Sequence, residues 1–197
     1  MEAFKKITAP IIPLSVDNID TDQIIPARYM KSTQKQGLGQ YLFYDWRFDS
    51  NGIPKKDFVL NQPGITCKIL VAGENFGSGS SREHAPWALQ DFGFRVIIAG
   101  SFADIFKHNA LNIGLLPVEV DKDFLNKIFR QYEKNPNTKV HVDLVKQKVE
   151  LTDTEESTYF EINQYKKKCL LKGIDDIDYL LNLKEEIIDY ENKRELI

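Results

Sequence analysis

The segment NFGSGSSREHAPWAL, residues 75–89, follows the apolar run ITCKILVA at residues 65–72 and leads into a pattern of helical spacing. The run is rich in β-branched residues and short enough for a buried strand. Residues 77–84 then combine two glycines, three serines, an arginine, a glutamate and a histidine. The first N–H groups of a helix have no partners within it and can bind an anion. The segment therefore predicts a functional site at a strand-to-helix turn.

Two starting points for this helix are compatible with the sequence. Ser80 and Glu83 have the S-x-x-E spacing of a capping box, which favours a start at Ser80 or Ser81. Pro86 favours a start nearer Ala85, because proline is tolerated in the first turn of a helix but not in its interior.

Apolar runs and helical patterns alternate along the rest of the chain. Strands are expected at residues 10–16, 65–72, 95–99 and 115–120, helices after residue 80 and at 102–111 and 121–135, and antiparallel strands at 140–145, 149–151 and 159–162. Two successive strand–helix–strand units predict an α/β fold with a mostly parallel sheet, whose sites gather at the carboxyl ends of the strands. The chain is expected to form one domain, residues 1–197, that ends in a helical C-terminal extension at residues 163–197.

The composition excludes several classes of protein. A net charge of −3 over 197 residues gives no field that would attract nucleic acid or an anionic membrane. The longest apolar runs are far shorter than the roughly 20 residues of a membrane-spanning helix, and the first ten residues lack the features of a secretion signal. A cytoplasmic location is expected. Cys67 and Cys169 are too few to hold an iron–sulfur cluster or a structural zinc ion, and both are expected to be buried.

Residues 27–56 form an aromatic-rich region with little periodicity. Long irregular segments of this kind are often lids or binding loops. Arg28 and Lys31, beside Tyr29 and Met30, would suit a lid that closes over an acidic, partly apolar substrate. The alternative is an insertion whose aromatic side chains pack on the body of the protein.

Two charged segments are expected to be structural. The acidic turn with Asp17, Asp20 and Asp22 does not have the spacing of an EF-hand, so its carboxylates are expected to cap the backbone. The run Lys166–Lys168 is expected to form a solvated face.

Residues 77–84 do not match three familiar motifs. The Walker A loop is absent from the sequence, and the dinucleotide fingerprint has Arg82 where its third glycine belongs. The hydrolase elbow G-x-S-x-G is out of register. A Ser80–His84 pair for acyl transfer remains an alternative, although His84 would lie on the helix itself, where a capping or packing role is expected. The simplest alternative is that the serines cap the helix and Arg82 pairs with Glu83 or another neighbour.

The whole chain resembles one family. The matching residues are 75–89, NIDTD at 18–22 with IIP at 24–26, LF at 42–43, DWRF at 45–48, SFADIF at 101–106, Asn109, Asn112 and GLLP at 114–117. They resemble the swivelling β/β/α domain of the aconitase superfamily, and within it the small subunits of the two-chain isopropylmalate isomerases. Most bacterial members have cysteine where this chain has Ser78, which is expected to change thiol reactivity more than catalysis.

The resemblance implies roles for particular residues. Ser80 would be the base that removes the carbon-bound proton, Arg82 would bind a substrate carboxylate, and Ser81 would belong to the same anion-binding turn. Arg28, Tyr29 and Met30 would select the variable group of the substrate.

The resemblance also implies a reaction and a partner. A hydro-lyase would interconvert 2- and 3-isopropylmalate through isopropylmaleate in leucine biosynthesis. The chain itself would hold no cofactor or metal, and a 4Fe-4S cluster would lie on a separate large subunit. Three alternatives remain open: a related dehydratase for homoaconitate or citraconate, a non-catalytic anion-binding module, and a free-standing serine hydrolase.

Overall fold

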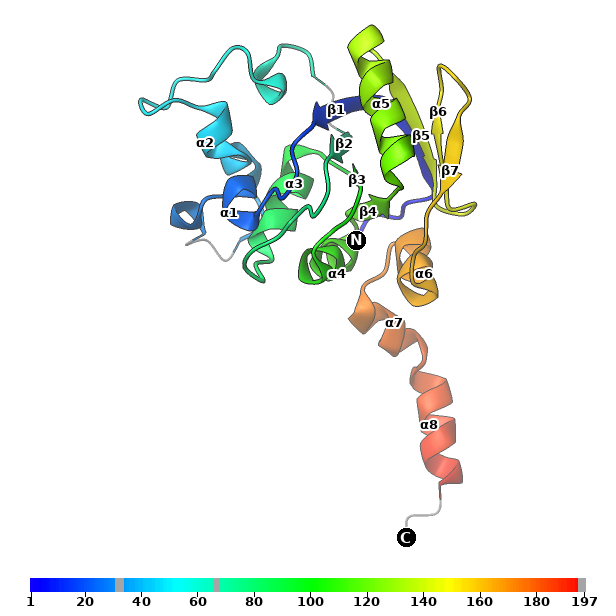
Figure 1. The fold of residues 1–197 in the computed structure, drawn as a ribbon. Coiled ribbons are helices and arrows are strands. Elements are labelled where there is room, and N and C mark those ends of the chain that lie inside the picture. Colours follow the sequence, from blue (N-terminus) through cyan, green and yellow to red (C-terminus); the bar gives the residue numbers. More distant parts are fainter. Residues whose placement is uncertain (31–33, 66–67, 195–197) are drawn as a thin grey trace.

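The computed structural model describes residues 1–30, 34–65 and 68–194. Its centre is a seven-stranded sheet in the order β4-β3-β2-β1-β5-β6-β7 (Figure 1). The strands are β1 (Lys6–Leu14), β2 (Ile69–Ala72), β3 (Val96–Ala99), β4 (Leu116–Glu119), β5 (Lys139–Asp143), β6 (Lys148–Leu151) and β7 (Ser157–Tyr159). Strands β1 to β4 run parallel, and β5 to β7 continue the sheet in antiparallel pairs. The expected α/β fold with additional antiparallel strands is confirmed.

Helices connect the parallel strands, and further helices come after β4 and after β7 in the chain. The longer ones are α3 (His84–Phe92) between β2 and β3, α4 (Asp104–Ile113) between β3 and β4, α5 (Lys122–Lys134), α6 (Gln164–Lys172), α7 (Asp176–Asn182) and α8 (Lys184–Lys193). Short helical segments lie between β1 and β2: α1 (Thr21–Ile24), η1 (Ala27–Tyr29), η2 (Leu38–Tyr41), α2 (Tyr44–Arg47) and η3 (Val59–Asn61). Among the described residues, no helix is long and apolar enough to cross a membrane.

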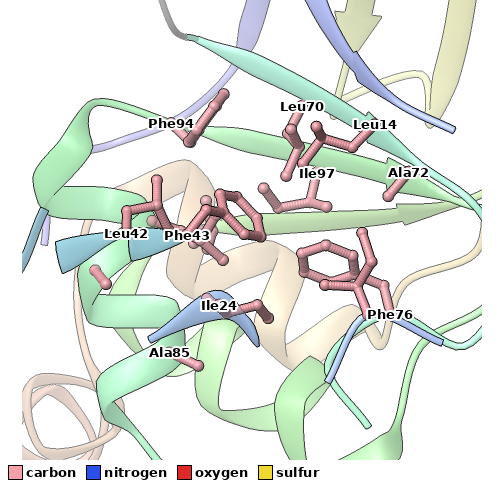
Figure 2. Packing of buried hydrophobic residues seen from close by; sticks show 14 of the residues in the cluster. Leu14, Ile24, Leu42, Phe43, Leu70, Ala72, Phe76, Ala85, Phe94 and Ile97 are labelled. Atoms are coloured by element: carbon pink, nitrogen blue, oxygen red, sulfur yellow. The ribbon is translucent and has the colours of Figure 1, made fainter. Parts of the chain in front are cut away.

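In strands β1 to β3, alternate residues are buried on opposite faces of the sheet, as the period of two requires. Leu14, Leu70 and Ile97 belong to one core cluster, which also contains residues of α1, α3 and the segment before β2 (Figure 2). The other face carries a second cluster with Phe124 and Ile128 of α5. Both faces are thus covered, which is why the central strands are apolar throughout.

Strand β1 joins the two halves of the sheet. It begins earlier than the expected residue 10, because Lys6–Pro10 pairs antiparallel with β5 while Ile11–Leu14 pairs parallel with β2. The partner of the first half lies more than 120 residues away in the sequence, so the local pattern could not reveal this pairing.

Part of the segment 27–56 packs on the body of the protein, while residues 49–56 are exposed. Leu38, Leu42 and Phe43 are almost completely buried. Gly39 lies so close to α3 that a Cβ there would be 2.7 Å from the backbone nitrogen of Phe92. The aromatic side chains therefore pack on the body, as one of the two alternatives expected, and a role of this segment as a lid stays a prediction.

The structure also describes one of the two cysteines and the lysine run at residues 166–168. Cys169 is buried, as expected, and Cys67 lies outside the described residues. The prediction of a solvated face at Lys166–Lys168 is wrong for Lys166, which is only 8% exposed. It is buried because its ammonium group has polar partners on α4 and α7, described below.

Candidate active site

The turn after β2 is held in place by backbone hydrogen bonds to two other segments. Gly77 N donates to Ile19 O at 2.7 Å, and Thr21 N donates to Ser78 O at 2.8 Å. On the other side, Phe76 N donates to Ser101 O at 3.0 Å. The turn thus lies between the segment that follows β1 and the segment that follows β3, at the carboxyl ends of parallel strands.

Gly77 allows this close packing. Its φ angle is +78°, and a Cβ at this position would lie 2.2 Å from Cγ of Phe106. Phe106 is 2% exposed and packs edge-to-face against Phe76. A residue with a side chain does not fit here without moving the aromatic ring, so this glycine is a structural requirement of the turn.

The helix after the turn begins later than the capping-box spacing suggests. Helix α3 starts at His84 with Glu83 as its N-cap, and no side chain caps it. The prediction of a start at Ser80 or Ser81 is therefore wrong, and the alternative near Ala85 is confirmed. Pro86 explains the difference, because in this register it lies in the first turn, where its missing N–H breaks no helical hydrogen bond.

Ser80 and Ser81 consequently lie on an exposed loop before the helix. Ser80 N donates to Thr21 Oγ1 at 3.2 Å, and Arg82 N donates to Ser80 O at 2.8 Å. These bonds fix the backbone on both sides of the Ser80 hydroxyl. Neither serine lines the cavity of about 660 Å³ that lies between α4 and α6.

Arg82 forms an ion pair with Asp22, with Nη1 of the arginine 2.5 Å from Oδ1 of the aspartate. The arginine side chain is 23% exposed and that of Asp22 is 55% exposed. The hydrogen bond from Arg82 holds the pKa of the Asp22 carboxyl below its ordinary value. A guanidinium has five N–H donors in a planar fork, so a cation held in this way can also bind a carboxylate ligand.

The other two aspartates of the acidic segment 17–22 accept hydrogen bonds from backbone N–H groups. Asp17 Oδ1 accepts from Glu74 N at 2.8 Å, and Asp20 caps α1 by accepting from Gln23 N at 2.8 Å. The expected capping role is confirmed for Asp20, whereas Asp17 binds a backbone N–H that lies 57 positions away in the chain. Asp22 does more than cap, because its Oδ1 accepts from Ala27 N at 3.2 Å as well as from Arg82.

Arg28 and Tyr29 lie in a separate aromatic group. Arg28 pairs with Asp45, and its guanidinium carbon is 4.7 Å from the centre of the Tyr29 ring. The hydrogen bond to Asp45 raises the pKa of Arg28 above its ordinary value. Tyr29 stacks on Tyr41 with ring centres 4.2 Å apart, and Met30 packs against the core cluster.

Ser80, Ser81 and Arg82 lie together in the turn after β2, whereas Arg28, Tyr29 and Met30 lie in the separate aromatic group. Asp22 connects the turn with the beginning of that group, because it accepts hydrogen bonds from Arg82 and from Ala27 N, the first residue of η1. Lys31 lies outside the described residues.

Sequence reasoning missed Thr21 and Asp22 as members of the site. Both lie within the segment NIDTD, which already stood out, but only the tertiary contact shows that they face residues 80–82. The expected neighbour of Arg82 among the simple alternatives was Glu83, and the structure provides Asp22 instead.

His84 begins α3, with its ring centre 5.0 Å from that of Trp87. This contact is the packing role expected for a histidine on the helix. Among residues 1–30, 34–65 and 68–194 there is no group of three or more His, Cys, Asp or Glu residues that could hold a metal ion.

The sequence is similar to known proteins of one family. A family profile described as the aconitase C-terminal domain matches residues 1–123. The 3-isopropylmalate dehydratase small subunit of Christiangramia forsetii is 53% identical over 194 residues, which is 98% of this chain and 95% of the relative. That of Cytophaga hutchinsonii is 51% identical over 191 residues, 97% of this chain and 95% of the relative. The chain therefore belongs to the family of 3-isopropylmalate dehydratase small subunits.

A solved structure agrees with this assignment. The crystal structure of 3-isopropylmalate dehydratase from Methanocaldococcus jannaschii superposes with a TM-score of 0.67 at 29% identity. The match covers 95% of this chain and 99% of that chain. The similarity therefore includes nearly all of the sheet and its helices.

Proposed function

We propose that this chain is the small subunit of a cytoplasmic hydro-lyase that interconverts 2-isopropylmalate and 3-isopropylmalate through isopropylmaleate. The observation that carries the proposal is the turn in which Ser80 and Arg82 are fixed by Thr21 and Asp22. The two relatives described above, both 3-isopropylmalate dehydratase small subunits, support it. The exposed position of Ser80 and Ser81 suits a site that a second protein surface completes.

The proposed role of Ser80 is proton transfer. Dehydration removes a proton from the carbon next to the one that bears the hydroxyl group; the electrons of that C–H bond form the double bond as hydroxide leaves. The Ser80 oxygen would accept this proton and return it on rehydration. A serine oxygen is a poor base unless its anionic form is stabilised, and the guanidinium of Arg82, two residues on, supplies positive charge for this.

Arg82 would also bind a carboxylate of the substrate through the N–H groups that Asp22 does not use. Asp22 fixes the position of the guanidinium and partly neutralises it before substrate arrives. The segment 27–56 would contribute Arg28, Tyr29 and Met30 to selection of the isopropyl group. We propose that these residues act within a single domain formed by residues 1–197.

The remaining chemistry would come from a large subunit. A 4Fe-4S cluster on that subunit would supply the Lewis acid that accepts the leaving hydroxide.

Reconstitution with the large subunit tests the proposal. We expect isopropylmaleate formation only by the two chains together. Ser80→Ala should reduce kcat by about 10²- to 10⁴-fold, the usual contribution of a general base, with unchanged complex formation. Ser157→Ala, on the distant exposed strand β7, is the matched control and should keep full activity. Turnover by this chain alone, or an unimpaired Ser80→Ala complex, would contradict the mechanism. Faster turnover of homoaconitate or citraconate than of isopropylmalate would favour a related dehydratase.

A further inference from the structure

Helices α7 and α8 form an arm, residues 176–193, that extends away from the sheet (Figure 1). Six apolar side chains of the arm are between 42% and 69% exposed: Ile177, Leu180, Leu181, Ile187, Ile188 and Tyr190. Single exposed apolar residues are ordinary on a protein surface, whereas neighbouring groups of them mark interaction sites.

Three of these residues lie close together on α7. Ile177, Leu180 and Leu181 are separated by three and four positions, so they lie on one side of α7. Helix α8 begins after a single turn residue, Leu183, and carries Ile187, Ile188 and Tyr190. The arm thus carries apolar side chains along both helices.

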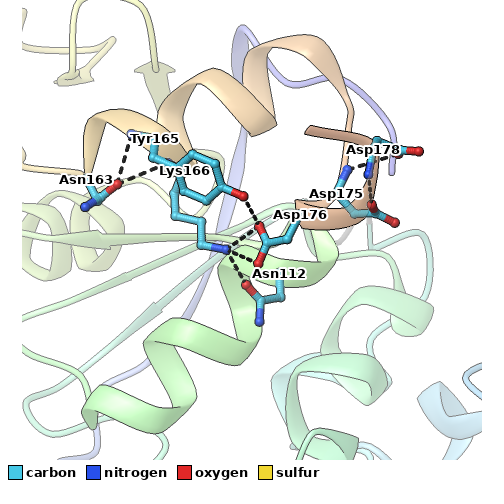
Figure 3. Close-up of polar contacts among 7 residues, drawn as sticks. All are labelled: Asn112, Asn163, Tyr165, Lys166, Asp175, Asp176 and Asp178. Atoms are coloured by element: carbon cyan, nitrogen blue, oxygen red, sulfur yellow. Dashed lines mark hydrogen bonds and ion pairs between the residues drawn. The ribbon is translucent and has the colours of Figure 1, made fainter. Parts of the chain in front are cut away.

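The base of the arm is fixed to the body by a polar cluster (Figure 3). The buried ammonium group of Lys166 on α6 donates to Asn112 Oδ1 of α4 at 2.7 Å and to both oxygens of Asp176 on α7, at 2.7 and 2.8 Å. Tyr165 Oη also donates to Asp176 Oδ1, at 2.8 Å. These bonds set the direction in which α7 leaves α6, so the arm presents its apolar surface in a defined place.

The charge of the arm restricts what can cover it. Residues 176–193 contain six carboxylate side chains and two lysines, a net charge of −4. Two arms packed against each other would bring two such charges together, which opposes a second copy as the occupant. A complementary partner has an apolar groove with basic residues at its rim.

We propose that this arm docks in such a groove on the large subunit. The inference rests on the proposed function, which requires a large subunit, and adds where that subunit binds. The docking surface is distinct from residues 80–82, so binding and chemistry can be tested separately.

The test measures the affinity of the full-length chain for the large subunit of the same organism by calorimetric titration. The variant Leu180→Ser/Ile187→Ser changes two exposed side chains of the arm, so the fold of the body is retained. We expect it to bind at least about 30-fold more weakly, as is usual when central apolar contacts of an interface are removed. Val145→Ser, also exposed but on the turn after β5, is the matched control and should bind like the wild type.

The outcomes separate this inference from the proposed function. The double variant should regain isopropylmaleate formation at saturating concentration, because Ser80 and Arg82 are untouched, whereas Ser80→Ala should bind normally and stay inactive. Equal affinity of the double variant and the wild type would overturn the inference and leave the proposed function standing. Self-association of the chain that the double variant alone abolishes, with unchanged affinity for the large subunit, would also overturn it in favour of a second copy. A wild-type chain that does not bind the large subunit would refute both.

Discussion

Replacing Gly77 by alanine tests whether the turn is held by close packing. At φ +78° the new Cβ would lie 2.2 Å from Phe106 Cγ and 2.6 Å from its Cβ and Cδ2. The left-handed backbone of a residue with a side chain contributes about 1–2 kcal/mol of destabilisation. Displacing a buried ring in a packed core contributes about 1–3 kcal/mol more. We expect Gly77→Ala to lower the free energy of unfolding by about 2–5 kcal/mol.

Gly64 offers a matched control, because its φ angle is +76° but nothing lies within 4 Å of a Cβ placed there. Gly64→Ala should show the backbone effect alone, about 1–2 kcal/mol. Urea unfolding followed by circular dichroism measures both variants. If Gly77→Ala is no more destabilising than Gly64→Ala, the ring of Phe106 does not confine the turn and the reasoning is wrong.

Three further predictions concern side chains around the turn and the arm. Asp22→Asn should raise KM severalfold with a smaller effect on kcat, because Arg82 loses its ion pair. Since the pKa of Asp22 is lowered from 3.8, the contribution of this pair to stability is present above that pH and disappears as the pH falls through the lowered value. The pair is partly exposed, so acid titration of unfolding should show a difference below about 1 kcal/mol between wild type and variant; a larger difference would contradict this. Ser78→Cys should keep turnover within about twofold, because Ser78 is held through its backbone carbonyl, while adding a thiol detectable with a thiol reagent; loss of turnover would show that the side chain matters. Asp176→Asn should destabilise the protein by about 1–3 kcal/mol in thermal or urea unfolding, because it leaves the buried Lys166 ammonium without its charged partner. Adding Lys166→Met to this variant should restore much of the lost stability; additive losses from the two substitutions would argue against a coupled pair.

The acidic turn shows where prediction from sequence stopped. Its carboxylates were expected to cap the backbone; Asp20 does so, whereas Asp17 accepts from the distant Glu74 N. The second role of Asp22 was not predictable, because Arg82 lies 60 positions away in the chain. Hydrogen bonds between distant segments depend on how the sheet aligns them.

The start of α3 shows a conflict between two local signals. The spacing of Ser80 and Glu83 favoured an early start, and Pro86 favoured a late one. The structure has the late start, in which Pro86 lies in the first turn of α3 and residues 76–80 remain outside the helix. The restriction that proline places on a helix interior thus outweighed the capping-box spacing.

The sequence by itself determined the alternation of strands and helices, the glycine- and serine-rich turn, and the family. These depend on local composition, hydrophobic period and motifs, which neighbouring residues carry. Only the tertiary structure decided that Thr21 and Asp22 face residues 80–82, that β1 pairs with both β2 and β5, and that Lys166 is buried beneath the arm. Each of these depends on contacts between residues far apart in the chain, which form only when the whole sheet is assembled.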